Sequence, residues 1–592
     1  MLVLAGPGSG KTTVISERVR YLIEEKGVSP EHILTITFTK TAALEMQRRC
    51  QRICPRAESA VFGTFHSVFY HFLRKSDKYY NFTLINEKQK KEMMRKLIPC
   101  GSMTPLQHLY VCEQMLKKIS CLKNSWAYEA EDMYVLQTKE RYCRLCEEQQ
   151  KLDFDDMLLL CYRLFTEHEE ELKKWQKRFL YVLVDEFQDI NRCQYEIVKL
   201  LVQMHGNIFA VGDDDQAIYS FRGSDPGFMK RFIEDFSLCK QIYLEENYRC
   251  GSEIVEVAGK SIGKNRNRFI KSVRAKGEFE NHVHRKRFRS AEEEAAGIAT
   301  EIKRRRAQES KKQSIAVLVR TNAQAGYIAE QFYQNEIPCI FKERKVCFYE
   351  QPVIIDLLSV LRFAVCGQKR SDFFVFMNKP FRGIERAMLE EEQVELNVIA
   401  MRLEERGNRL LAKEINMLER KIHFIQEMDP YGALTFILHG LKYDTYLEAL
   451  AGEDEKVRQQ IDETIRDLLM RAHGFKNIAL FLSFVEKYIA CFHEEEADGR
   501  EKQAKSEDAI ELLTYHGAKG LEFDCVFLPM LNDGMVPRGR MLTQEQMEEE
   551  RRMFYVAMTR AKCNLYLSWT GKEEGMEASV FLRELETDAI GT

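Results

Sequence analysis

Short apolar runs alternate with charged, helix-forming stretches at the start of the chain. Residues 2–5 and 32–38 are apolar runs, and residues 13–25 and 41–49 are the charged stretches behind them. Continuous apolar runs of this length are typical of buried parallel strands, and the strand–helix rhythm is typical of α/β folds. A third apolar segment, residues 61–67, repeats the arrangement. The pattern predicts a parallel sheet with helices on its faces.

The same rhythm returns in the middle and at the end of the chain. Further strands are expected within residues 179–189, 207–216, 313–320, 509–515, 524–531 and 564–569, with a helix at 323–335 and an extended piece at 338–341. Two long stretches, residues 68–150 and 367–504, instead have a helical pattern of mixed charge with few strand signals. They are interpreted as helical domains inserted into the sheet-based part of the chain.

The first apolar run leads into a glycine-rich loop that opens a helix. Such a loop lets backbone N–H groups converge on an anion, and the helix N-terminus adds its positive dipole end. We expect Lys11 to reach the β- and γ-phosphates of a nucleotide and Thr12 to hold Mg²⁺. The alternative is a strand-to-helix turn with a chance Gly-Lys pair. The residues expected around the phosphates are Ala5, Gly6, Pro7, Gly8, Ser9, Gly10, Lys11, Thr12 and Thr13.

Two adjacent carboxylates follow the strand expected within residues 179–189. Asp185 would hold Mg²⁺ together with Thr12, and Glu186 would orient and deprotonate an attacking water. Without the phosphate loop, an acidic pair in this position would favour a plain helix N-cap. Gln216 ends the acidic turn after the next strand and is placed to sense a γ-phosphate.

Aromatic side chains lie next to hydroxyls or cations near the ends of several expected strands. Phe38 follows Thr37, Tyr219 and Phe221 precede Arg222, and Tyr248 precedes Arg249. Aromatic faces interleaved with a cation are typical of single-strand binding, at about 1–3 kcal/mol per stacked base. Taken alone, the segments around Phe38 and residues 61–67 favour core packing plus a turn.

Composition narrows the class of protein. With 592 residues the chain is expected to form several domains, and no segment approaches ~18 consecutive apolar residues, so no membrane partner is expected. The 17 cysteines are scattered, odd in number and expected to be reduced inside the cell; Cys143 and Cys146 favour helix packing over a metal site. Because the net charge is −3, nucleic-acid binding would rest on local patches.

The order of the motifs resembles the UvrD/Rep/PcrA family of superfamily 1A DNA helicases. The resemblance spans nearly the whole chain. It rests on the sequences at residues 8–12 (Gly-Ser-Gly-Lys-Thr), 37–40 (Thr-Phe-Thr-Lys), 63–67 (Gly-Thr-Phe-His-Ser), 184–189 (Val-Asp-Glu-Phe-Gln-Asp), 212–219 (Gly-Asp-Asp-Asp-Gln-Ala-Ile-Tyr), 246–249 (Glu-Asn-Tyr-Arg), 513–523 and 550–562.

The resemblance implies an α/β fold with two RecA-like P-loop domains that have parallel sheets, each interrupted by a helical insertion. ATP would lie between the two RecA-like domains. The implied boundaries are 1–75 with 151–245 for the first RecA-like domain (1A), 76–150 for its insertion (1B), 246–366 with 505–592 for the second (2A), and 367–504 for its insertion (2B).

The resemblance to this family also implies roles for the residues that match its motifs. Lys11, Thr12, Asp185, Glu186 and Gln216 would come from the first RecA-like domain. Arg249 and Arg560 would reach the γ-phosphate from the second, with Tyr248 stacked on adenine and Glu522 against the ribose. Out of context, Arg560 would be interpreted as a charge on a surface helix. The single-strand track would comprise Phe38, Thr64, His66, Tyr219, Phe221, Thr514 and His516, with Arg222 beside it and Lys519 as a further candidate.

The function implied is an ATP-dependent 3′→5′ DNA helicase and single-stranded DNA translocase acting in DNA repair, replication or recombination. Its cofactors would be ATP and Mg²⁺. Its partners would be single-stranded DNA, 3′-tailed duplex DNA and a protein that loads it, in the bacterial cytoplasm at the nucleoid. The alternative is an ATP-gated DNA-binding or remodelling protein without processive unwinding. An RNA-directed enzyme ranks last, because nothing in the sequence reads a 2′-hydroxyl.

Two departures from the family pattern bear on the nucleotide. Family members usually carry a segment before the phosphate loop with a glutamine that reads adenine, whereas this sequence begins at the strand, so either its start is truncated or Tyr248 mainly holds the base. The sequence also ends soon after the last motif, which disfavours a helicase–nuclease fusion. We therefore predict weaker ATP affinity than in relatives and similar Michaelis constants for ATP and GTP. Strongly different constants in steady-state hydrolysis would contradict this.

Overall fold

The computed structural model describes most of the chain. The described residues are 1–100, 105–125, 133–220, 223–276, 282–308, 313–341, 347–389, 391–452, 455–497, 509–539, 541–571 and 577–587. The chain divides into two compact units. Unit 1 comprises Met1–Glu294, Glu309–Ile315 and Ala518–Thr592, and unit 2 comprises Ala295–Gln308 and Ala316–Gly517. The division into four domains expected from the sequence is finer, and its boundaries stay a prediction.

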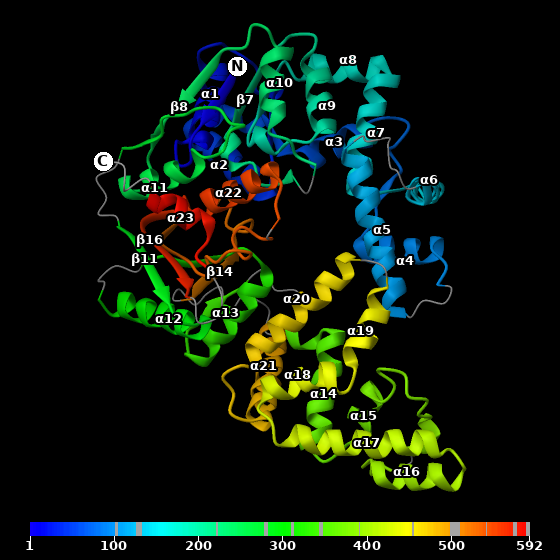
Figure 1. The fold of residues 1–592 in the computed structure, drawn as a ribbon. Helices are drawn as coiled ribbons and strands as arrows, with labels where there is room; N and C mark the ends of the chain where they lie inside the picture. Colours follow the sequence, from blue (N-terminus) through cyan, green and yellow to red (C-terminus); the bar gives the residue numbers. More distant parts are fainter. Residues whose placement is uncertain are drawn as a thin grey trace. The chain divides into compact units, whose positions relative to one another are not determined.

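The first sheet lies in unit 1 and has six parallel strands in the order β3-β2-β6-β7-β1-β8. The strands are β1 (Leu2–Ala5), β2 (Ile33–Thr37), β3 (Val61–Thr64), β6 (Tyr181–Val184), β7 (Ile208–Gly212) and β8 (Gln241–Leu244). The helices around it are α1 (Lys11–Glu24), α2 (Lys40–Ile53), α3 (Phe65–Arg74), α7 (Phe154–Glu167), α8 (Glu169–Arg178), α9 (Arg192–Val202) and α10 (Gly227–Asp235) (Figure 1).

Both faces of this sheet are buried, which explains why its strands are apolar without interruption. Alternate residues of β1 point to opposite faces. Val3 packs in the core formed with α1 and α2, whereas Leu2 and Leu4 pack in the core formed with α3, α7, α9 and α10. The parallel sheet predicted from the apolar runs is therefore confirmed.

A helical insertion with a small core of its own interrupts this part of the chain. It contains α4 (Glu87–Leu97), α5 (Pro105–Ser125) and α6 (Met133–Glu148), flanked by the short paired strands β4 (Thr83–Leu84) and β5 (Lys151–Leu152). Cys146 packs in this core, and Cys143 lies on the same helix. The carboxylate of Asp153 caps α7, and it also pairs with the fully buried Lys123.

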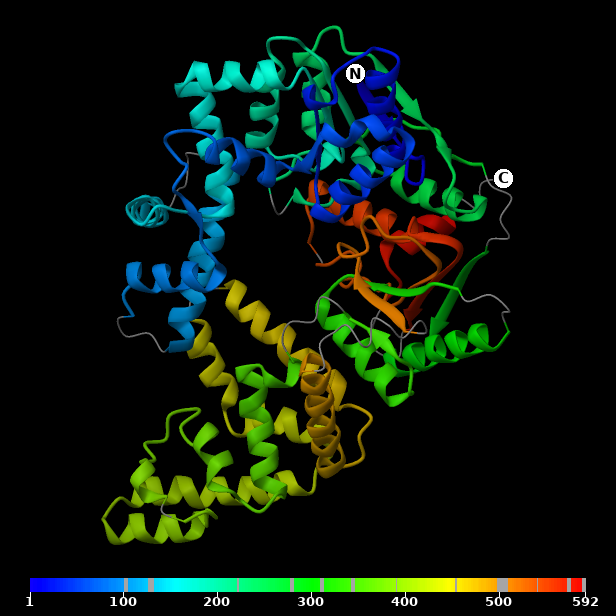
Figure 2. The same ribbon diagram turned by 180° about the vertical axis from the view of Figure 1, so that it is seen from behind.

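The second sheet is also parallel, with the order β11-β16-β15-β12-β14-β13. Its strands are β11 (His282–Phe288), β12 (Ile315–Val319), β13 (Cys339–Ile340), β14 (Ile510–Thr514), β15 (Phe523–Leu528) and β16 (Ala561–Thr570). The other elements of this part of the sequence are α11 (Ser252–Ile262), α12 (Ala291–Gln308), α13 (Asn322–Gln334), α22 (Gln544–Met558), α23 (Val580–Thr587) and the paired strands β9 (Glu246–Asn247) and β10 (Arg274–Ala275) (Figure 2). Two six-stranded parallel sheets confirm the predicted fold class.

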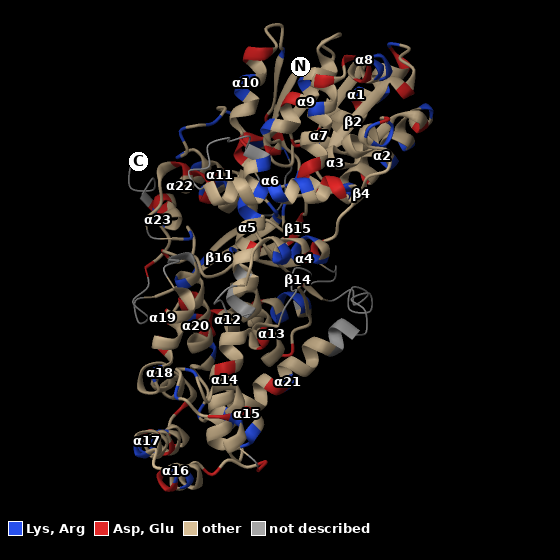
Figure 3. Cartoon of the chain, turned by 90° about the vertical axis from the view of Figure 1, so that its right-hand side faces the viewer, with Lys and Arg blue, Asp and Glu red and all other residues tan. Residues whose placement is uncertain are grey.

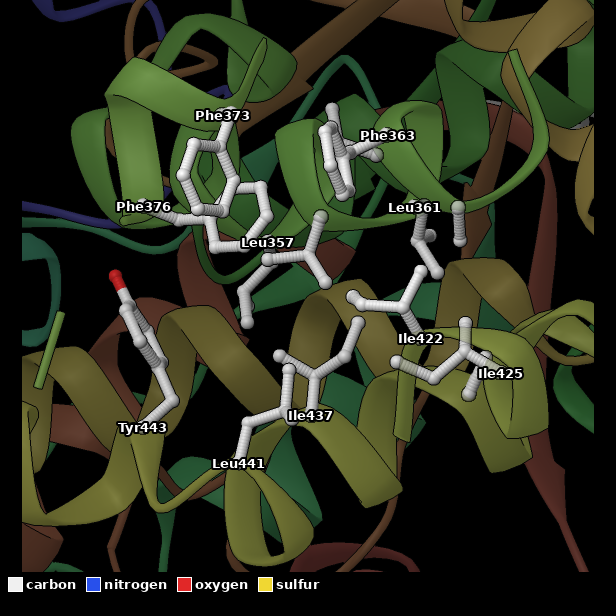
Figure 4. Packing of buried hydrophobic residues seen from close by; sticks show 14 of the residues in the cluster. Leu357, Leu361, Phe363, Phe373, Phe376, Ile422, Ile425, Ile437, Leu441 and Tyr443 are labelled. Carbon is white, nitrogen blue, oxygen red and sulfur yellow. The ribbon is translucent and has the colours of Figure 1, made fainter. Parts of the chain in front are cut away.

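The stretch expected to be a second helical insertion is helical and lies in unit 2. Helix α14 (Pro352–Val365) precedes this stretch, and the helices within it are α15 (Arg370–Phe376), α16 (Leu396–Glu405), α17 (Arg409–Gln426), α18 (Pro430–Gly440), α19 (Tyr443–Ala451), α20 (Glu455–Ala472) and α21 (Ile478–Ala497). In the core that α14 shares with these helices, Leu357 and Leu361 face Ile422 of α17 and Ile437 of α18, while the ring of Phe363 packs against Phe373 and Phe376 of α15 (Figure 4).

Short 3₁₀ turns complete the described elements. They are η1 (Pro30–His32), η2 (Pro55–Ser59), η3 (Phe187–Asp189), η4 (Asp214–Gln216), η6 (Phe348–Glu350) and η7 (Arg386–Met388). Within the described ranges, no helix has both the length and the apolar character needed to cross a membrane.

The packing of α14 predicts a clear difference between two leucines of unit 2. Leu361 is completely buried, whereas Leu410 on α17 is 83% exposed. Leu361→Ala should destabilise the protein by about 2–5 kcal/mol through lost burial and a cavity. Leu410→Ala, the matched control, should change stability by less than about 0.5 kcal/mol. The shift in urea midpoint of the unfolding phase of unit 2 measures both, and equal shifts would contradict the assigned core.

Candidate active site

The glycine-rich loop joins β1 to α1 and leaves the first turn of the helix open to an anion. Gly8 and Gly10 have φ of 64° and 84°, values that favour glycine. Gly10 precedes α1 without a side-chain cap, and the first turn carries no acidic residue. The N–H groups at the start of α1 therefore have no side-chain acceptor and can bind a phosphate.

A cavity of about 870 Å³ in unit 1 contains most of the residues predicted for the nucleotide site. Ala5, Gly6 and Pro7 do not line it. The predicted nucleotide-site residues that line it are Gly8, Ser9, Gly10, Lys11, Thr12, Thr13, Asp185, Glu186, Gln216, Tyr248, Arg249, Glu522 and Arg560. Sequence reasoning missed a wall formed by α2, which contributes Glu45, Met46 and Arg49. Arg49 Nη1 donates to Thr13 Oγ1 at 3.1 Å.

The two carboxylates after β6 have different electrostatic environments. Burial and the neighbouring Glu186 raise the pKa of Asp185 to about 7. Although burial opposes it, Lys11 and Lys519 hold the pKa of Glu186 below its ordinary value. Glu186 is thus kept ionised, as a general base requires.

The donor groups at Asp185 fit a divalent cation. Asp185 Oδ1 is buried and has no hydrogen-bond partner among the described residues, and the Thr12 hydroxyl belongs to the lining of the same cavity. Carboxylate and hydroxyl oxygens are ligands that Mg²⁺ accepts, usually with phosphate oxygens and water. A bound cation would also favour the ionised form of Asp185.

The acidic turn after β7 connects Lys11, Gln216 and Arg560. Lys11 Nζ lies 3.9 Å from Asp213 Oδ2, and Gln216 Nε2 donates to the same oxygen at 2.6 Å. The other end of the amide, Gln216 Oε1, accepts from Arg560 Nη2 at 3.2 Å. The predicted sensor amide therefore contacts one of the predicted phosphate-binding arginines directly.

Both predicted arginines line the same cavity as Lys11. Arg560 is 2% exposed and also donates to the Leu521 carbonyl, so it is not a surface charge. Burial and the nearby Arg249 lower the pKa of Arg560 to about 10. Arg249 Nε donates to Glu522 Oε2 at 2.7 Å. Glu522 also pairs with Lys562 at 2.9 Å; its contact with a ribose stays a prediction.

The segment that carries Tyr248 is held against the phosphate loop. The Tyr248 N–H donates to the Gly8 carbonyl at 3.0 Å, while the residue is 54% exposed. Asn247, which sequence reasoning missed, is fully buried and shapes this turn, because its Oδ1 accepts from the N–H groups of Arg249 and Cys250, each at 2.8 Å. An exposed ring beside the phosphate loop is available to stack on a base.

Two residues predicted for the DNA track lie face to face. The rings of Phe38 and Tyr219 stack at 4.9 Å between centroids and 15° between planes. Lys519 Nζ lies 4.9 Å from the centroid of the Tyr219 ring, donates to the Gln216 carbonyl at 2.8 Å, and pairs with Asp189. This aromatic pair therefore belongs to the same contact network as Gln216.

The other track residues that the structure describes have different contacts. Thr64 pairs in register with Thr37, the residue before Phe38. Thr64 caps α3, and His66 meets the ring of Phe154 edge-on at 5.7 Å. Thr514 and His516 belong to unit 2, where Thr514 Oγ1 accepts from the Gly517 N–H. Two further candidates, Phe221 and Arg222, lie outside the described residues.

Comparison with known proteins gives consistent matches along the chain. Residues 1–237 match the UvrD/REP helicase N-terminal domain and residues 242–572 match the UvrD-like helicase C-terminal domain. The chain is 32% identical to a putative ATP-dependent DNA helicase YjcD of Bacillus subtilis, over 98% of this chain and 78% of that protein. It is 30% identical to the ATP-dependent DNA helicase PcrA of Staphylococcus aureus, over 99% and 84% respectively, and 30% identical to that of Staphylococcus epidermidis, over 100% and 85%.

The contact between the phosphate loop and the Tyr248 segment predicts a specific defect. A Cβ at Gly8 would lie 2.7 Å from both Arg249 Cβ and Asn247 Oδ1. Gly8→Ala should therefore push the two segments apart and raise the Michaelis constant for ATP roughly tenfold or more, which corresponds to about 1.4 kcal/mol of binding.

Gly27→Ala is the matched control. Gly27 has the same φ of 64° but nothing within 4 Å of the added Cβ. Both variants should lose about 1 kcal/mol of stability from backbone strain, and only Gly8→Ala should change ATP hydrolysis. An equal effect of both on the Michaelis constant would show that strain alone, and not the contact with residues 247–249, is responsible.

Proposed function

The chain belongs to the UvrD/Rep family of helicases, which are ATP-dependent DNA helicases, and we propose that it moves along single-stranded DNA in the 3′→5′ direction and unwinds 3′-tailed duplexes. The observation that carries this proposal is the contact network around Gln216. One end of this residue meets Arg560, and its backbone carbonyl meets Lys519, which covers Tyr219 of the stacked aromatic pair.

In this proposal ATP is held and hydrolysed by residues that line the cavity. Lys11 and the first turn of α1 bind the phosphates, and Glu186 takes the proton of the attacking water. Mg²⁺, held by Thr12 and Asp185, would neutralise charge on the phosphates. Arg560 and Arg249 stabilise the charge that develops on the γ-phosphoryl group, a contribution that can be worth about 10³–10⁵ in rate.

The contact network around Gln216 connects the proposed site of hydrolysis to the aromatic pair proposed to bind DNA. When the γ-phosphate leaves, Arg560 and Gln216 lose a shared anion, and Lys519 transmits the change of position to Tyr219. Phe38 and Tyr219 stack on one another, so a base that enters between them must part the rings. Opening and closing this pair once per ATP would move one strand past the protein. Stacking of this kind tolerates any base sequence.

A net charge of −3 gives the chain no overall attraction to DNA. In this proposal the attraction comes from local basic surfaces. Helix α4 carries five Lys or Arg residues (88, 90, 91, 95 and 96) against two Glu residues (87 and 92). Figure 3 shows this concentration of Lys and Arg on α4. Such a helix is suited to the phosphates of a nucleic acid. We place the activity in DNA repair, replication or recombination.

Tailed duplexes test the proposal. Single-stranded DNA should stimulate ATP hydrolysis, and ATP should separate a 3′-tailed duplex but not a 5′-tailed one.

Glu186→Gln should bind ATP with unchanged affinity and stop turnover and unwinding, because the base is lost while the binding groups stay. Arg560→Ala should slow hydrolysis by about 10³-fold or more while DNA binding persists.

Each alternative has its own result. DNA-stimulated hydrolysis without strand separation would favour an ATP-gated remodelling protein, and equal stimulation by RNA and DNA would favour an RNA-directed enzyme. Unwinding from 5′ tails alone would overturn the direction, and hydrolysis indifferent to nucleic acid would overturn translocation altogether.

A further inference from the structure

Three consecutive buried carboxylates precede Gln216. Asp213, Asp214 and Asp215 are 0%, 3% and 1% exposed, and one oxygen of each lies within 4.8 Å of the others, a spacing that would suit a metal ion. Three carboxylates cannot be buried together without compensation, because each loses the solvation of its charge. The cation that compensates them is a residue that no sequence pattern singles out.

That cation is Lys271, which follows α11 and β9 in the sequence. Its side chain is fully buried, and Nζ lies 2.6 Å from Asp213 Oδ1, 2.5 Å from Asp214 Oδ1 and 2.9 Å from Asp215 Oδ2. Two of its three N–H donors bond to Asp213 and Asp214, and Asp215 lies at ion-pair distance. Although burial opposes it, these carboxylates hold the pKa of Lys271 above its ordinary value, and the group stays charged.

Neighbours of Lys271 fix the same turn. Arg268 donates to both oxygens of Asp215, from Nε at 2.7 Å and from Nη2 at 2.6 Å. The Phe269 N–H donates to Asp214 Oδ2 at 2.6 Å. Residues 268–271 therefore bind all three carboxylates and set the position of the whole turn.

Lys271 and the nucleotide machinery share one carboxylate. Asp213 Oδ1 accepts from Lys271, and Asp213 Oδ2 accepts from Gln216 Nε2 and lies near Lys11. With its Nε2 engaged by Asp213, the Gln216 amide has one orientation, in which Oε1 faces Arg560. Releasing Asp213 would let the amide turn over and present N–H donors to a guanidinium, which cannot accept them.

We propose that Lys271 is a positioning residue for ATP hydrolysis: it holds Asp213 so that the Gln216 amide presents its oxygen to Arg560. This role goes beyond charge compensation and rests on the proposed roles of Gln216 and Arg560 in hydrolysis. It predicts an effect on turnover rather than on ATP binding, since Lys271 does not line the cavity.

The test removes Lys271 without changing the net charge of the cluster. In the full chain, Lys271→Met combined with Asp214→Asn removes one cation and one anion, and Asp213 loses its bond to Lys271. Basal kcat should fall about 10²-fold, the loss that a misplacement of about 1 Å can cause, while the Michaelis constant for ATP changes less than about threefold. Retained kcat in the folded double variant would overturn the proposal.

A matched control comes from the insertion. Lys123 is also fully buried and pairs with Asp153 at 2.8 Å and Asp156 at 2.6 Å, but none of the three lines the nucleotide cavity. Lys123→Met with Asp156→Asn repeats the same charge change and should leave basal kcat unaltered. An equal loss of kcat in this control would show that the effect reports general destabilisation and would overturn the proposal.

Coupling to Gln216 is the decisive measurement. Gln216→Ala alone should lower kcat, and adding it to the Lys271/Asp214 double variant should lower kcat little further, since both changes disturb the same amide. If the two losses of kcat multiply in the combined variant, Lys271 acts independently of Gln216, and the proposal is overturned. If the double variant does not fold, Lys271→Arg keeps the charge but misfits the space of an ammonium; it should lower kcat in protein that is still folded at the assay temperature, and full activity there would overturn the proposal.

Failure of the proposed translocation is detected separately. It would appear as a wild-type protein whose hydrolysis ignores single-stranded DNA. The Lys271 comparison uses basal hydrolysis in the absence of DNA, so it gives an answer in either case.

Discussion

Buried negative charge at the carboxyl edge of the first sheet is the constraint on which the active site depends. Asp185, Asp189 and Asp213–Asp215 are buried there, beside the half-buried Glu186. Their cations come from remote points of the chain: Lys11 from the phosphate loop, Arg268 and Lys271 from the segment after α11, and Lys519 from the segment before β15. Separating a buried pair leaves one charge uncompensated, which costs about 3–5 kcal/mol. These segments are therefore held together at the site of chemistry.

The cations divide two tasks between them. Lys271 contacts its three carboxylates at 2.5–2.9 Å and its side chain has no exposed surface, whereas Lys11 is 3.9 Å from Asp213 and its side chain is partly exposed. Lys271 and Arg268 neutralise two of the three charges of the acidic turn, and Lys271 does more than Lys11 to hold the pKa of Asp213 low. Lys11, at the longer distance, can then turn to a phosphate while Asp213 keeps its closer partner Lys271. A site that must release its anion once per cycle benefits from keeping structural and ligand-binding cations apart.

Sequence patterns predicted those features of the molecule that depend on residues close together in the sequence. The strand at Leu2–Ala5, the glycine-rich loop and the carboxylates after β6 follow from apolar runs, glycines and strand ends, and the predicted parallel sheets were confirmed. The contributions of Lys271, Asn247 and Arg49 could not be found in this way. Lys271 and Asp213 are 58 residues apart in the sequence, and Lys271 is one of several Lys and Arg residues in its segment, so no local signal distinguishes it. Only the fold shows that a triple carboxylate lies opposite it.

A comparison of Lys271 with Lys123, in the helical insertion, shows that burial of a lysine does not by itself indicate function. The contacts made by its carboxylate partners do. Lys123 has the same chemistry as Lys271: full burial, two carboxylate partners and bonds of ordinary length. There, however, Asp153 and Asp156 use their remaining capacity within the capping box of α7, so the charge cluster ends in a helix terminus. At Lys271 the second oxygen of Asp213 continues to Gln216, and Gln216 continues to Arg560 and, through Lys519, to the stacked rings. A buried ion cluster can affect function when one of its members also contacts a group that moves during the reaction. Here that member is Asp213, and the group is the amide of Gln216.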